Sequence, residues 1–494
     1  MNLNKLLDGI PHEIIQIGEN TEISSVTIDS RQVKPGALFI CLRGLNFDGH
    51  NFIKPVAEAG AAAVMVAEAA DSYPSNLTVI RVQNTRQAMA HVAANYYGHP
   101  AKKLRLIGVT GTNGKTTTTY FIEELLRKLG HKVGLIGTVG ARVGDTQLDI
   151  PYATSTTPDP LELHAIFAKM VELGVQDVVM EVTSHALALF KMEGLTFDVG
   201  VFTNLTQDHL DFHGTMENYA LAKAQLFAQS KIAIVNDDDE YTPTMLRFFK
   251  GKPIKYGINS DTGLQAKNIE YHPHGSTFEL MGQKFHLPVS GKFNIYNILA
   301  TIGTAIALNI NAKFSKADTV PDYTMEIRKA VSEISGVPGR IQSVPNNLGV
   351  QIFVDYAHSP DGLQNIINSV REVTQGRVIT LFGCGGDRDK TKRPIMGRIA
   401  GELSDYCILT SDNPRTEDPF AIIAHAEEGV KQTVTSCEIC ENRKDAIFAG
   451  VKMLQKGDAL IIAGKGHEDY QEVGTTKYPF SDYDTAIQAI ESRT

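Results

Sequence analysis

The stretch from Leu104 to Gly130 constrains the fold of this chain more than any other. It reads LRLIGVT, then GTNGKTTTT, then YFIEELLRKLG, which predicts a buried strand, a glycine-bearing turn and a helix. Glycines in such a turn let the backbone approach a phosphate closely, and N–H groups at the turn and the helix start point at it. The pattern therefore predicts a nucleotide-binding α/β domain.

The residues of the turn fit a nucleotide bound with a metal ion. Gly111 and Gly114 allow the close approach. Lys115 supplies a fixed positive charge, and Thr116 offers a hydroxyl to Mg²⁺. The strict P-loop spacing requires glycine where Val109 stands, so the match is to a shortened variant. A glycine-rich turn alone also fits a tight connection, but the flanking strand and helix favour phosphate binding.

Bulk properties indicate a multidomain enzyme. A length of 494 residues predicts about three domains, and 43% hydrophobic with 21% charged residues is ordinary for a soluble globular protein. The net charge of −9 argues against broad nucleic-acid binding. We see no secretory leader and no apolar run of membrane-spanning length, so we expect a cytoplasmic location without membrane insertion. The single C-x-x-C, Cys437 to Cys440, favours reduced thiols over a metal site.

Alternating strand and helix patterns predict an α/β fold with three domains. Residues 1–103 form a small N-terminal α/β domain. Residues 104–336 are predicted to form a central, P-loop-type nucleotide-binding domain with a mainly parallel sheet. A Pro/Gly break at Gly336 to Arg340 marks a linker. Residues 337–494 restart the alternation and form a Rossmann-like, doubly wound domain.

A carboxylate ends one apolar strand of the central domain. In DVVMEVTSHAL, Glu181 follows a run of buried-strand residues. A carboxylate at the tip of a parallel strand is costly to bury without a cation, and such tips are where α/β sheets place ligands. Glu181 therefore predicts a Mg²⁺ site. The next strand ends in a polar cluster that includes Asp208, His209 and His213.

Other polar residues have ordinary structural interpretations on sequence alone. Thr156 and Thr157 stand where they could cap a helix that starts near Leu161. Asn294, in the opening turn of a predicted helix, could cap it or contact a nucleotide. Lys223, on another predicted helix, has no role that its position alone indicates. The N-terminal loops DSR and GLNFDGHNF could be solvated turns.

Three strands of the last domain end in polar loops, GCGGDRDKTKR, SDNPRTEDP and GKGHEDYQ, which predict a crevice at one sheet edge. Arg388 and Arg415 suit bidentate binding of carboxylates, while Asp412 and Glu468 suit ammonium groups. Together with a Mg-nucleotide site, this predicts a ligase that uses ATP to join an acid to an amine. A kinase or a regulatory NTPase would share the nucleotide half.

Motifs along nearly the whole chain resemble those of the Mur ligase family. They occur in the family's order: GTNGKTT, TTPDP, EVTSHAL, TNLTQDHLDFHG, YALAKAQLF, GKFNIYN, VPGR, DYAHSPDGL, FGCGGDRDKTKRP, SDNPRTEDP and GKGHEDYQ. The chain looks most like members that add the third peptide residue to UDP-N-acetylmuramoyl-L-alanyl-D-glutamate in peptidoglycan precursor synthesis. The resemblance is looser over residues 1–103.

The resemblance implies a UDP-substrate domain, an ATPase domain and an amino-acid domain, and a reaction through an acyl phosphate. It implies ATP contacts at Gly111, Thr112, Asn113, Gly114, Lys115, Thr116, Thr117, Asn294, Arg340 and Asp355, and a catalytic His358. It implies Mg²⁺ near Thr116, Glu181, His209 and a carbamylated Lys223. UDP-substrate contacts fall on Ser30, Leu45, Asn46, Phe47, Thr156, Thr157, Thr183 and Lys191. Lys191 stands where the family usually has arginine, so the positive charge is kept but the bidentate hydrogen bonding of a guanidinium is lost.

The resemblance also predicts the amino acid. Asp412, Asn413, Pro414 and Arg415 form the DNPR motif of members that add meso-diaminopimelate, and lysine-adding members lack this arginine. Lysine would leave the Arg415 guanidinium desolvated without a partner carboxylate. The further implied contacts are Arg388, Gly464 and Glu468. The alternatives are an L-lysine-adding or dipeptide-adding member, a folylpolyglutamate-synthetase-like ligase, or a scaffold without catalysis. We expect a monomer.

Overall fold

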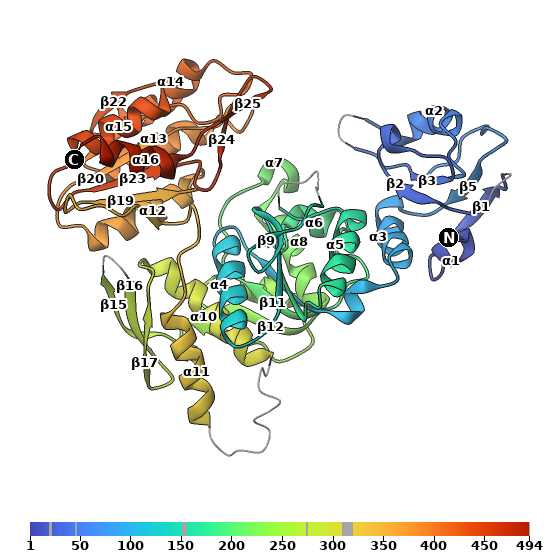
Figure 1. Cartoon of the computed structure of the whole chain (residues 1–494), viewed down its shortest axis with the longest axis horizontal. Coiled ribbons are helices and arrows are strands. Elements are labelled where there is room, and N and C mark those ends of the chain that lie inside the picture. Colours follow the sequence, from blue (N-terminus) through green and yellow to red (C-terminus); the bar gives the residue numbers. More distant parts are fainter. Residues whose placement is uncertain (19–21, 45–46, 151–155, 273–274, 309–319, 494) are drawn as a thin grey trace. The chain divides into compact units, whose positions relative to one another are not determined.

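The computed structural model describes residues 1–18, 22–44, 47–150, 156–272, 275–308 and 320–493 (Figure 1). The chain divides into two compact units, Met1–Tyr256 with Ala300–Ala317, and Gly257–Leu299 with Asp318–Thr494. The fold is α/β, as the sequence predicts, and the division into three domains stays a prediction. Within the described residues, every helix is too short or too polar to span a bilayer.

The N-terminal part of the first unit is built on a five-stranded sheet. Its order is β1 (Glu13–Gln16), β5 (Thr78–Arg81), β4 (Ala63–Val66), β3 (Ala37–Ile40) and β2 (Ser25–Thr27). Only β1 runs antiparallel to its neighbour. Its helices are α1 (Leu3–Leu6), α2 (Ile53–Glu58) and α3 (Thr85–Tyr96). Apolar clusters on alternating strand residues, Leu38 and Ile40 in one and Phe39 in the other, fill both faces.

The second sheet of this unit contains the predicted nucleotide strand, β6, at its centre. The order is β13 (Ile254–Gly257), β12 (Ser230–Asn236), β11 (Phe197–Phe202), β6 (Arg105–Thr110), β10 (Asp177–Glu181), β7 (Val133–Gly137), β8 (Gly140–Val143) and β9 (Thr146–Gln147). The strands from β13 to β7 are parallel, and β8 and β9 are antiparallel additions. The mainly parallel sheet matches the prediction.

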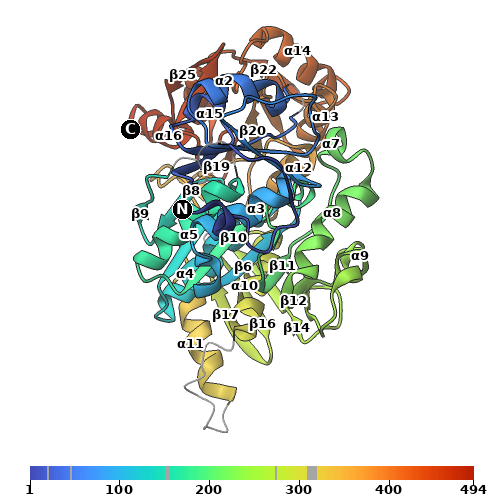
Figure 2. The same ribbon diagram turned by 90° about the vertical axis from the view of Figure 1, so that its right-hand side faces the viewer.

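Helices cover this sheet because its strands are apolar on both faces. The helices are α4 (Lys115–Lys128), α5 (Pro160–Glu172), α6 (Ser184–Ala188), α7 (Leu210–His213), α8 (Met216–Ala228) and α9 (Thr242–Met245). Figure 2 shows α4, α5 and α8 around the strands β6, β10 and β11. In β6, Gly108 is required by packing, since a Cβ there would lie 2.9 Å from both Leu226 and Phe197.

The prediction that Thr156 and Thr157 cap a helix is wrong. Helix α5 begins at Pro160, close to the predicted start, and its N-cap is Asp159. The Asp159 side chain and the Glu162 side chain form a capping box across the first turn. The two threonines are therefore available for other contacts.

The second unit begins with a segment that the sequence did not predict. The sequence predicts that strand–helix alternation continues here, whereas the structure contains an antiparallel meander of three strands. These strands are β15 (Lys267–His272), β16 (Gly275–Leu280) and β17 (Gln283–Leu287). The short β14 (Leu264–Gln265) precedes it, and α10 (Lys292–Ala307), whose residues from Ala300 on belong to the first unit, and α11 (Val320–Ser332) follow. Its outer strand β15 is mostly exposed, so it lacks the apolar run that marks a buried strand.

The rest of the second unit is doubly wound, as predicted. The sheet order is β18 (Gln342–Ser343), β19 (Gln351–Asp355), β23 (Ala459–Ala463), β20 (Val378–Phe382), β21 (Tyr406–Leu409) and β22 (Ser436–Ile439), parallel except for β18. Separate apolar cores lie on its two faces. The helices are α12 (Pro360–Val373), α13 (Lys392–Leu403), α14 (Pro419–Val430), α15 (Arg443–Met453) and α16 (Asp482–Glu491). A hairpin, β24 (Tyr470–Val473) and β25 (Thr476–Pro479), follows β23.

Candidate active site

The predicted phosphate loop joins β6 to α4. Gly111 and Gly114 have φ angles of 153° and 81°, values that side-chain-bearing residues rarely adopt. Helix α4 starts at Lys115, and its N-cap Gly114 places no side chain over the helix start. The Lys115 ammonium crosses the loop and donates to the carbonyls of Gly111, at 3.0 Å, and Thr112, at 2.9 Å. The result is a helix N-terminus suited to an anion, with a cation at its first residue.

The end of the neighbouring strand β11 holds this loop in place. The Asn113 N–H donates to Asn204 Oδ1 at 3.0 Å, and the Asn113 carbonyl accepts from Asn204 Nδ2 at 3.1 Å and Thr203 Oγ1 at 2.7 Å. Thr203 and Asn204 were not among the predicted site residues. The available signal was their position directly after a buried strand, the same signal that indicated Glu181.

Glu181 is buried beside the loop. Its side chain is 1% exposed. Its oxygens accept from Thr116 Oγ1, at 3.1 Å each, and from the Thr138 N–H at 2.9 Å. Among the described residues no Lys, Arg or His lies within ion-pair distance of it. A desolvated carboxylate surrounded by neutral donors fits a hard cation such as Mg²⁺.

Lys223 is not a solvated surface lysine. It lies on α8, is 2% exposed, donates to the Gly111 carbonyl at 2.7 Å, and stands 4.7 Å from the centre of the Tyr219 ring. Burial, with the Lys115 charge adding to it, holds the pKa of its ammonium well below the ordinary value. Burial therefore favours a neutral, nucleophilic amine at this position.

His209 precedes α7 with a left-handed backbone, φ 53°, and its ring packs edge-on against His185 and Tyr219. Burial lowers its pKa, so the neutral ring, which can coordinate a metal, is favoured. Within the described residues, no group of three or more His, Cys, Asp or Glu side chains forms a protein-only metal cage. Mg²⁺ usually relies on one or two carboxylates together with phosphate oxygens and water, so this donor set still fits it.

Thr156 and Thr157, in the loop before α5, lie close to Glu181. Thr157 Oγ1 donates to the Glu181 carbonyl at 3.0 Å and to Thr183 Oγ1 at 3.3 Å. Thr156 Oγ1 lies 3.2 Å from Thr138 Oγ1. Lys191 is buried, pairs with Asp159 at 3.0 Å and donates to the Thr157 carbonyl at 3.3 Å. The structure thus brings Thr156, Thr157, Thr183 and Lys191 together next to Glu181.

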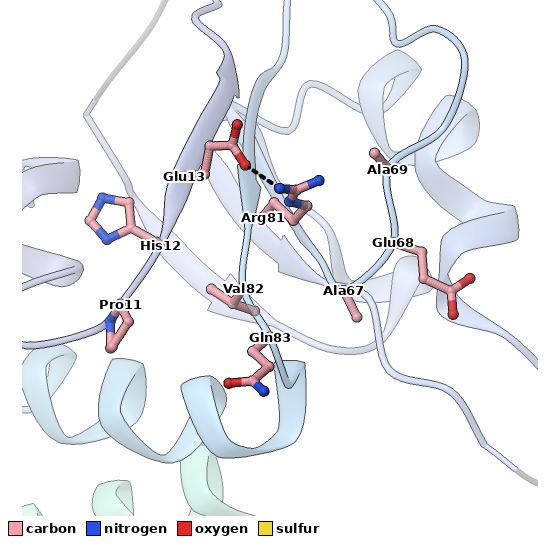
Figure 3. Close-up of a pocket in the computed structure, with 9 residues that line it drawn as sticks. All are labelled: Pro11, His12, Glu13, Ala67, Glu68, Ala69, Arg81, Val82 and Gln83. Carbon is pink, nitrogen blue, oxygen red and sulfur yellow. Dashed lines mark ion pairs between the residues drawn. The ribbon is translucent and has the colours of Figure 1, made fainter.

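The N-terminal residues lie at a different sheet edge. Ser30 opens a 3₁₀ turn, Ser30–Gln32, capped by the Asp29 carboxylate, and Phe47 is exposed. Leu45 and Asn46 lie outside the described residues. Figure 3 shows a pocket near β1, β4 and β5, lined by Pro11, His12, Glu13, Ala67, Glu68, Ala69, Arg81, Val82 and Gln83. Its Glu13 pairs with Arg81, and Glu68 pairs with Arg43, so its carboxylates are compensated.

The second unit holds the remaining predicted nucleotide residues. Asp355, at the end of β19, accepts from the Ile341 and Ala357 N–H groups at 2.7 and 2.8 Å. Its burial raises the pKa of the carboxyl, an effect that Arg340 opposes. Arg340 lies 4.8 Å from the Tyr356 ring centre. Asn294 is buried and donates to the Ser290 carbonyl at 2.8 Å, so it closes the first turn of α10. His358 is exposed.

The loops after β20, β21 and β23 meet, as the sequence predicts for neighbouring parallel strands. A Cβ on Gly385 would lie 3.2 Å from Arg415 Nη1 and 3.7 Å from Arg388 Cγ, so both arginines pass the same glycine. A Cβ on Gly464 would overlap the Asp412 carboxylate. The structure therefore gathers Arg388, Asp412, Arg415 and Gly464 at one edge.

A buried lysine links these loops. Lys465 is fully buried and donates to Asn413 Oδ1 at 3.0 Å and to Glu468 Oε2 at 2.9 Å, while Asn413 Nδ2 donates to the same Glu468 oxygen at 2.9 Å. Pro414 is also buried. Lys465 was not among the predicted residues. A lysine between two glycines directly after a buried strand was the signal that could have indicated it.

The arginines of two ion pairs also donate hydrogen bonds to backbone carbonyls of these loops. Arg443 and Asp482, both fully buried, pair at 2.7 Å, and Arg443 also donates to the carbonyls of Ser411 and Ala463, which precede Asp412 and Gly464. In the second pair, Arg393 donates to Glu417 at 2.8 Å and to the Gly385 carbonyl at 3.1 Å. These partners are far apart in sequence, so only the fold identifies them.

Comparison with known proteins places these motifs in a family context. Family models described as Mur ligase family, catalytic domain, as Mur ligase middle domain and as Mur ligase, glutamate ligase domain match residues 22–97, 109–305 and 339–466. A Caldanaerobacter subterraneus subsp. tengcongensis protein named UDP-N-acetylmuramoyl-L-alanyl-D-glutamate--2,6-diaminopimelate ligase is 43% identical over 98% of this chain and 97% of its own length.

Solved structures extend the comparison. One described as UDP-N-acetylmuramoyl-L-alanyl-D-glutamate--2,6-diaminopimelate ligase matches with a TM-score of 0.68 at 28% identity, covering 100% of this chain and 99% of its own. Folylpolyglutamate synthase of Mycobacterium tuberculosis, complexed with ADP and AMPPCP, matches with a TM-score of 0.61 at 16% identity, covering 76% of this chain and 92% of its own. The second likeness concerns the fold alone.

Proposed function

Because the chain belongs to the Mur ligase family, we propose that it is an ATP-dependent ligase that adds meso-diaminopimelate to UDP-N-acetylmuramoyl-L-alanyl-D-glutamate, a step of peptidoglycan precursor synthesis. The D-glutamyl carboxylate attacks the γ-phosphate of ATP, so an acyl phosphate forms and ADP leaves. The amine of the amino acid then displaces phosphate through a tetrahedral intermediate. The relative from Caldanaerobacter bears the name of this activity.

The choice of amino acid rests on one observation, the meeting of Arg388 and Arg415 at Gly385. Diaminopimelate has an ammonium and a carboxylate at each end, whereas lysine lacks the far carboxylate. We assign Arg388, Arg415 and the buried carboxylate of Asp412, which stand on loops at one sheet edge, as the receptor for such a doubly zwitterionic molecule. Arg415 pairs with Glu472 at 3.0 Å, and lysine, which has no far carboxylate, would leave the Arg415 Nη groups without the second anion that diaminopimelate supplies, so we expect the site to favour diaminopimelate.

On the nucleotide side, Lys115 and the start of α4 bind the phosphates and stabilise the charge that develops during transfer. Mg²⁺, when bound, supplies charge neutralisation at the phosphate oxygens. Thr116, Glu181 and His209 are the residues we assign to it. Lys223 joins them as a carbamate, since its neutral amine is the form that reacts with carbon dioxide and a carbamate oxygen suits a hard cation.

The remaining assignments rest on the family resemblance. We assign the UDP-dipeptide to Ser30, Phe47 and the cluster of Thr156, Thr157, Thr183 and Lys191, with Leu45 and Asn46 as further contacts. Asn294, Arg340, Asp355 and His358 are assigned to the nucleotide and its γ-phosphate. A cytoplasmic, monomeric enzyme acting as three domains, with boundaries at residues 103 and 336, completes the proposal.

The test is an assay of ADP release from ATP with the UDP-dipeptide, in the presence of meso-diaminopimelate, L-lysine or neither. Release only with diaminopimelate supports the proposal, and equal release with lysine contradicts it. Arg415→Ala should raise the KM for diaminopimelate by at least about tenfold, as expected for loss of a charge-assisted pair. Arg398→Ala, which removes an exposed arginine of α13, is the matched control and should leave this KM unchanged.

A further inference from the structure

Two glycines bring the turn that carries Arg340 into backbone contact with the loop after β23. A Cβ on Gly339, which has φ 68°, would overlap the backbone of Gly466 and the backbone nitrogen of His467. A Cβ on Gly466, which has φ 55°, would lie 2.6 Å from Tyr356 Cβ and 2.8 Å from the Gly339 carbonyl oxygen. The Gly339 carbonyl also accepts from the Tyr356 N–H at 2.9 Å. The turn, the end of β19 and the loop after β23 therefore meet at these glycines.

The Tyr356 ring lies at the centre of this contact. The Arg340 guanidinium carbon lies 4.8 Å from the ring centre. The His467 ring centre is 5.1 Å away, with the two ring planes inclined by 40°, and the His358 ring centre is 4.8 Å away, with the planes inclined by 66°. A guanidinium over an aromatic face is attracted by the ring quadrupole and stacks on it. The Tyr356 ring therefore restricts the directions in which Arg340 can point.

His467 packs on this ring from the loop that also carries amino-acid residues. Burial, with the Arg340 charge adding to it, lowers the pKa of the imidazole to about 4. A neutral imidazole can pack against Tyr356 without repelling the guanidinium. The loop itself is held on its other side, because the buried Lys465 donates to Asn413 Oδ1 at 3.0 Å. His467 is thus a fixed support for the Tyr356 ring.

We infer that Tyr356 and His467 are positioning residues, which hold the Arg340 guanidinium in the orientation that binds the γ-phosphate of ATP. The inference rests on the proposed function, because that function assigns Arg340 to the γ-phosphate. Neither ring acts on the nucleotide directly in this role. Loss of the Tyr356 ring should therefore weaken nucleotides that have a γ-phosphate and spare ADP.

The test measures by calorimetry how the full-length protein binds ADP and AMPPCP, a nonhydrolysable ATP analogue with a γ-phosphate, in the presence of Mg²⁺. We expect Tyr356→Leu to weaken AMPPCP about fivefold, through loss of the guanidinium–ring contact, and to leave ADP within about twofold of wild type. Tyr356→Phe keeps the ring and should keep both affinities. His467→Ala should also weaken AMPPCP selectively, and His467→Phe, which restores a ring, should reverse this. Tyr478→Leu, which removes an exposed ring on β25, is the matched control.

A double variant separates positioning from a merely structural role. If Tyr356 acts through Arg340, Tyr356→Leu should add nothing to the loss of AMPPCP affinity in Arg340→Ala, because residues that act as one unit are not additive. An equal loss for ADP, a loss that persists in the Arg340→Ala background, or no loss in Tyr356→Leu or His467→Ala would each overturn the inference. Unchanged AMPPCP affinity in Arg340→Ala would overturn it as well. Wild-type protein that releases no ADP with diaminopimelate would instead contradict the proposed function, and the binding measurements do not depend on that assay.

Discussion

Replacement of Gly137 by alanine tests the role of Glu181 without touching it. Gly137 ends β7, and a Cβ there would overlap Glu181 Oε1, with Cδ and Cγ of the same side chain at 3.0 and 3.1 Å. The backbone of Gly137 is not left-handed, so alanine introduces no strain of its own. The carboxylate is the far end of a flexible side chain and therefore moves, whereas the strand stays in place.

The displacement can be converted into a rate. To reach ordinary packing distance, the Glu181 oxygen must retreat by roughly 1 Å. That shift also breaks its hydrogen bonds from Thr116 and the Thr138 N–H. A misplacement of about 1 Å in a positioned group costs on the order of 100-fold in rate. We therefore expect Gly137→Ala to lower kcat for ADP release by about that factor and to raise the Mg²⁺ concentration needed for half-maximal activity.

The control is Gly263→Ala, because a Cβ at Gly263 would meet no atom within 4 Å. The thermal unfolding midpoint of Gly137→Ala should stay within a few degrees of wild type, which separates loss of function from loss of fold. Wild-type kcat and wild-type Mg²⁺ dependence in Gly137→Ala would refute the placement of the metal at Glu181.

Two further predictions concern the supports of the amino-acid loops. Hydrogen bonding from Arg393 lowers the pKa of Glu417 from 4.5 to about 2, so its stabilisation is complete above its unfolded pKa and lost as pH falls through the folded value. In calorimetry, wild type should have a higher Tm than Glu417→Gln, and this difference should be constant above about pH 5.5. As the pH falls from 4.5 to 2, the difference should shrink toward zero. A difference that persists undiminished at pH 2 would contradict this. Asp482→Asn should lower the free energy of unfolding of the second unit by about 3–5 kcal/mol in denaturant unfolding, because it leaves the Arg443 guanidinium as a buried charge without its counter-ion. Asp484→Asn, which changes an exposed carboxylate, is the control. An effect of Asp482→Asn no larger than that of the control would contradict the prediction.

The element types of the two large sheets could be predicted from the sequence because their strands are buried on both faces. In runs such as Val178 to Met180, the side chains toward both faces of the sheet are apolar, and glycine or proline residues mark the ends of such runs. The meander β15–β17 was missed, since its partly exposed strands carry no such run. The cap of α5 was also misplaced, because Asp159 competes with the two threonines for that role and only the backbone geometry decides.

The sequence by itself determined the chemistry carried by each loop: a glycine turn with Lys115, a carboxylate at the end of β10, and arginines after β20 and β21. These are local properties, since residue type and position after a strand suffice to state them. The tertiary structure decided the partners. Burial of Lys223, the Arg443–Asp482 pair and the contact of Glu472 with Arg415 join residues distant in sequence, and pairing between distant residues leaves no periodic signal in a single chain.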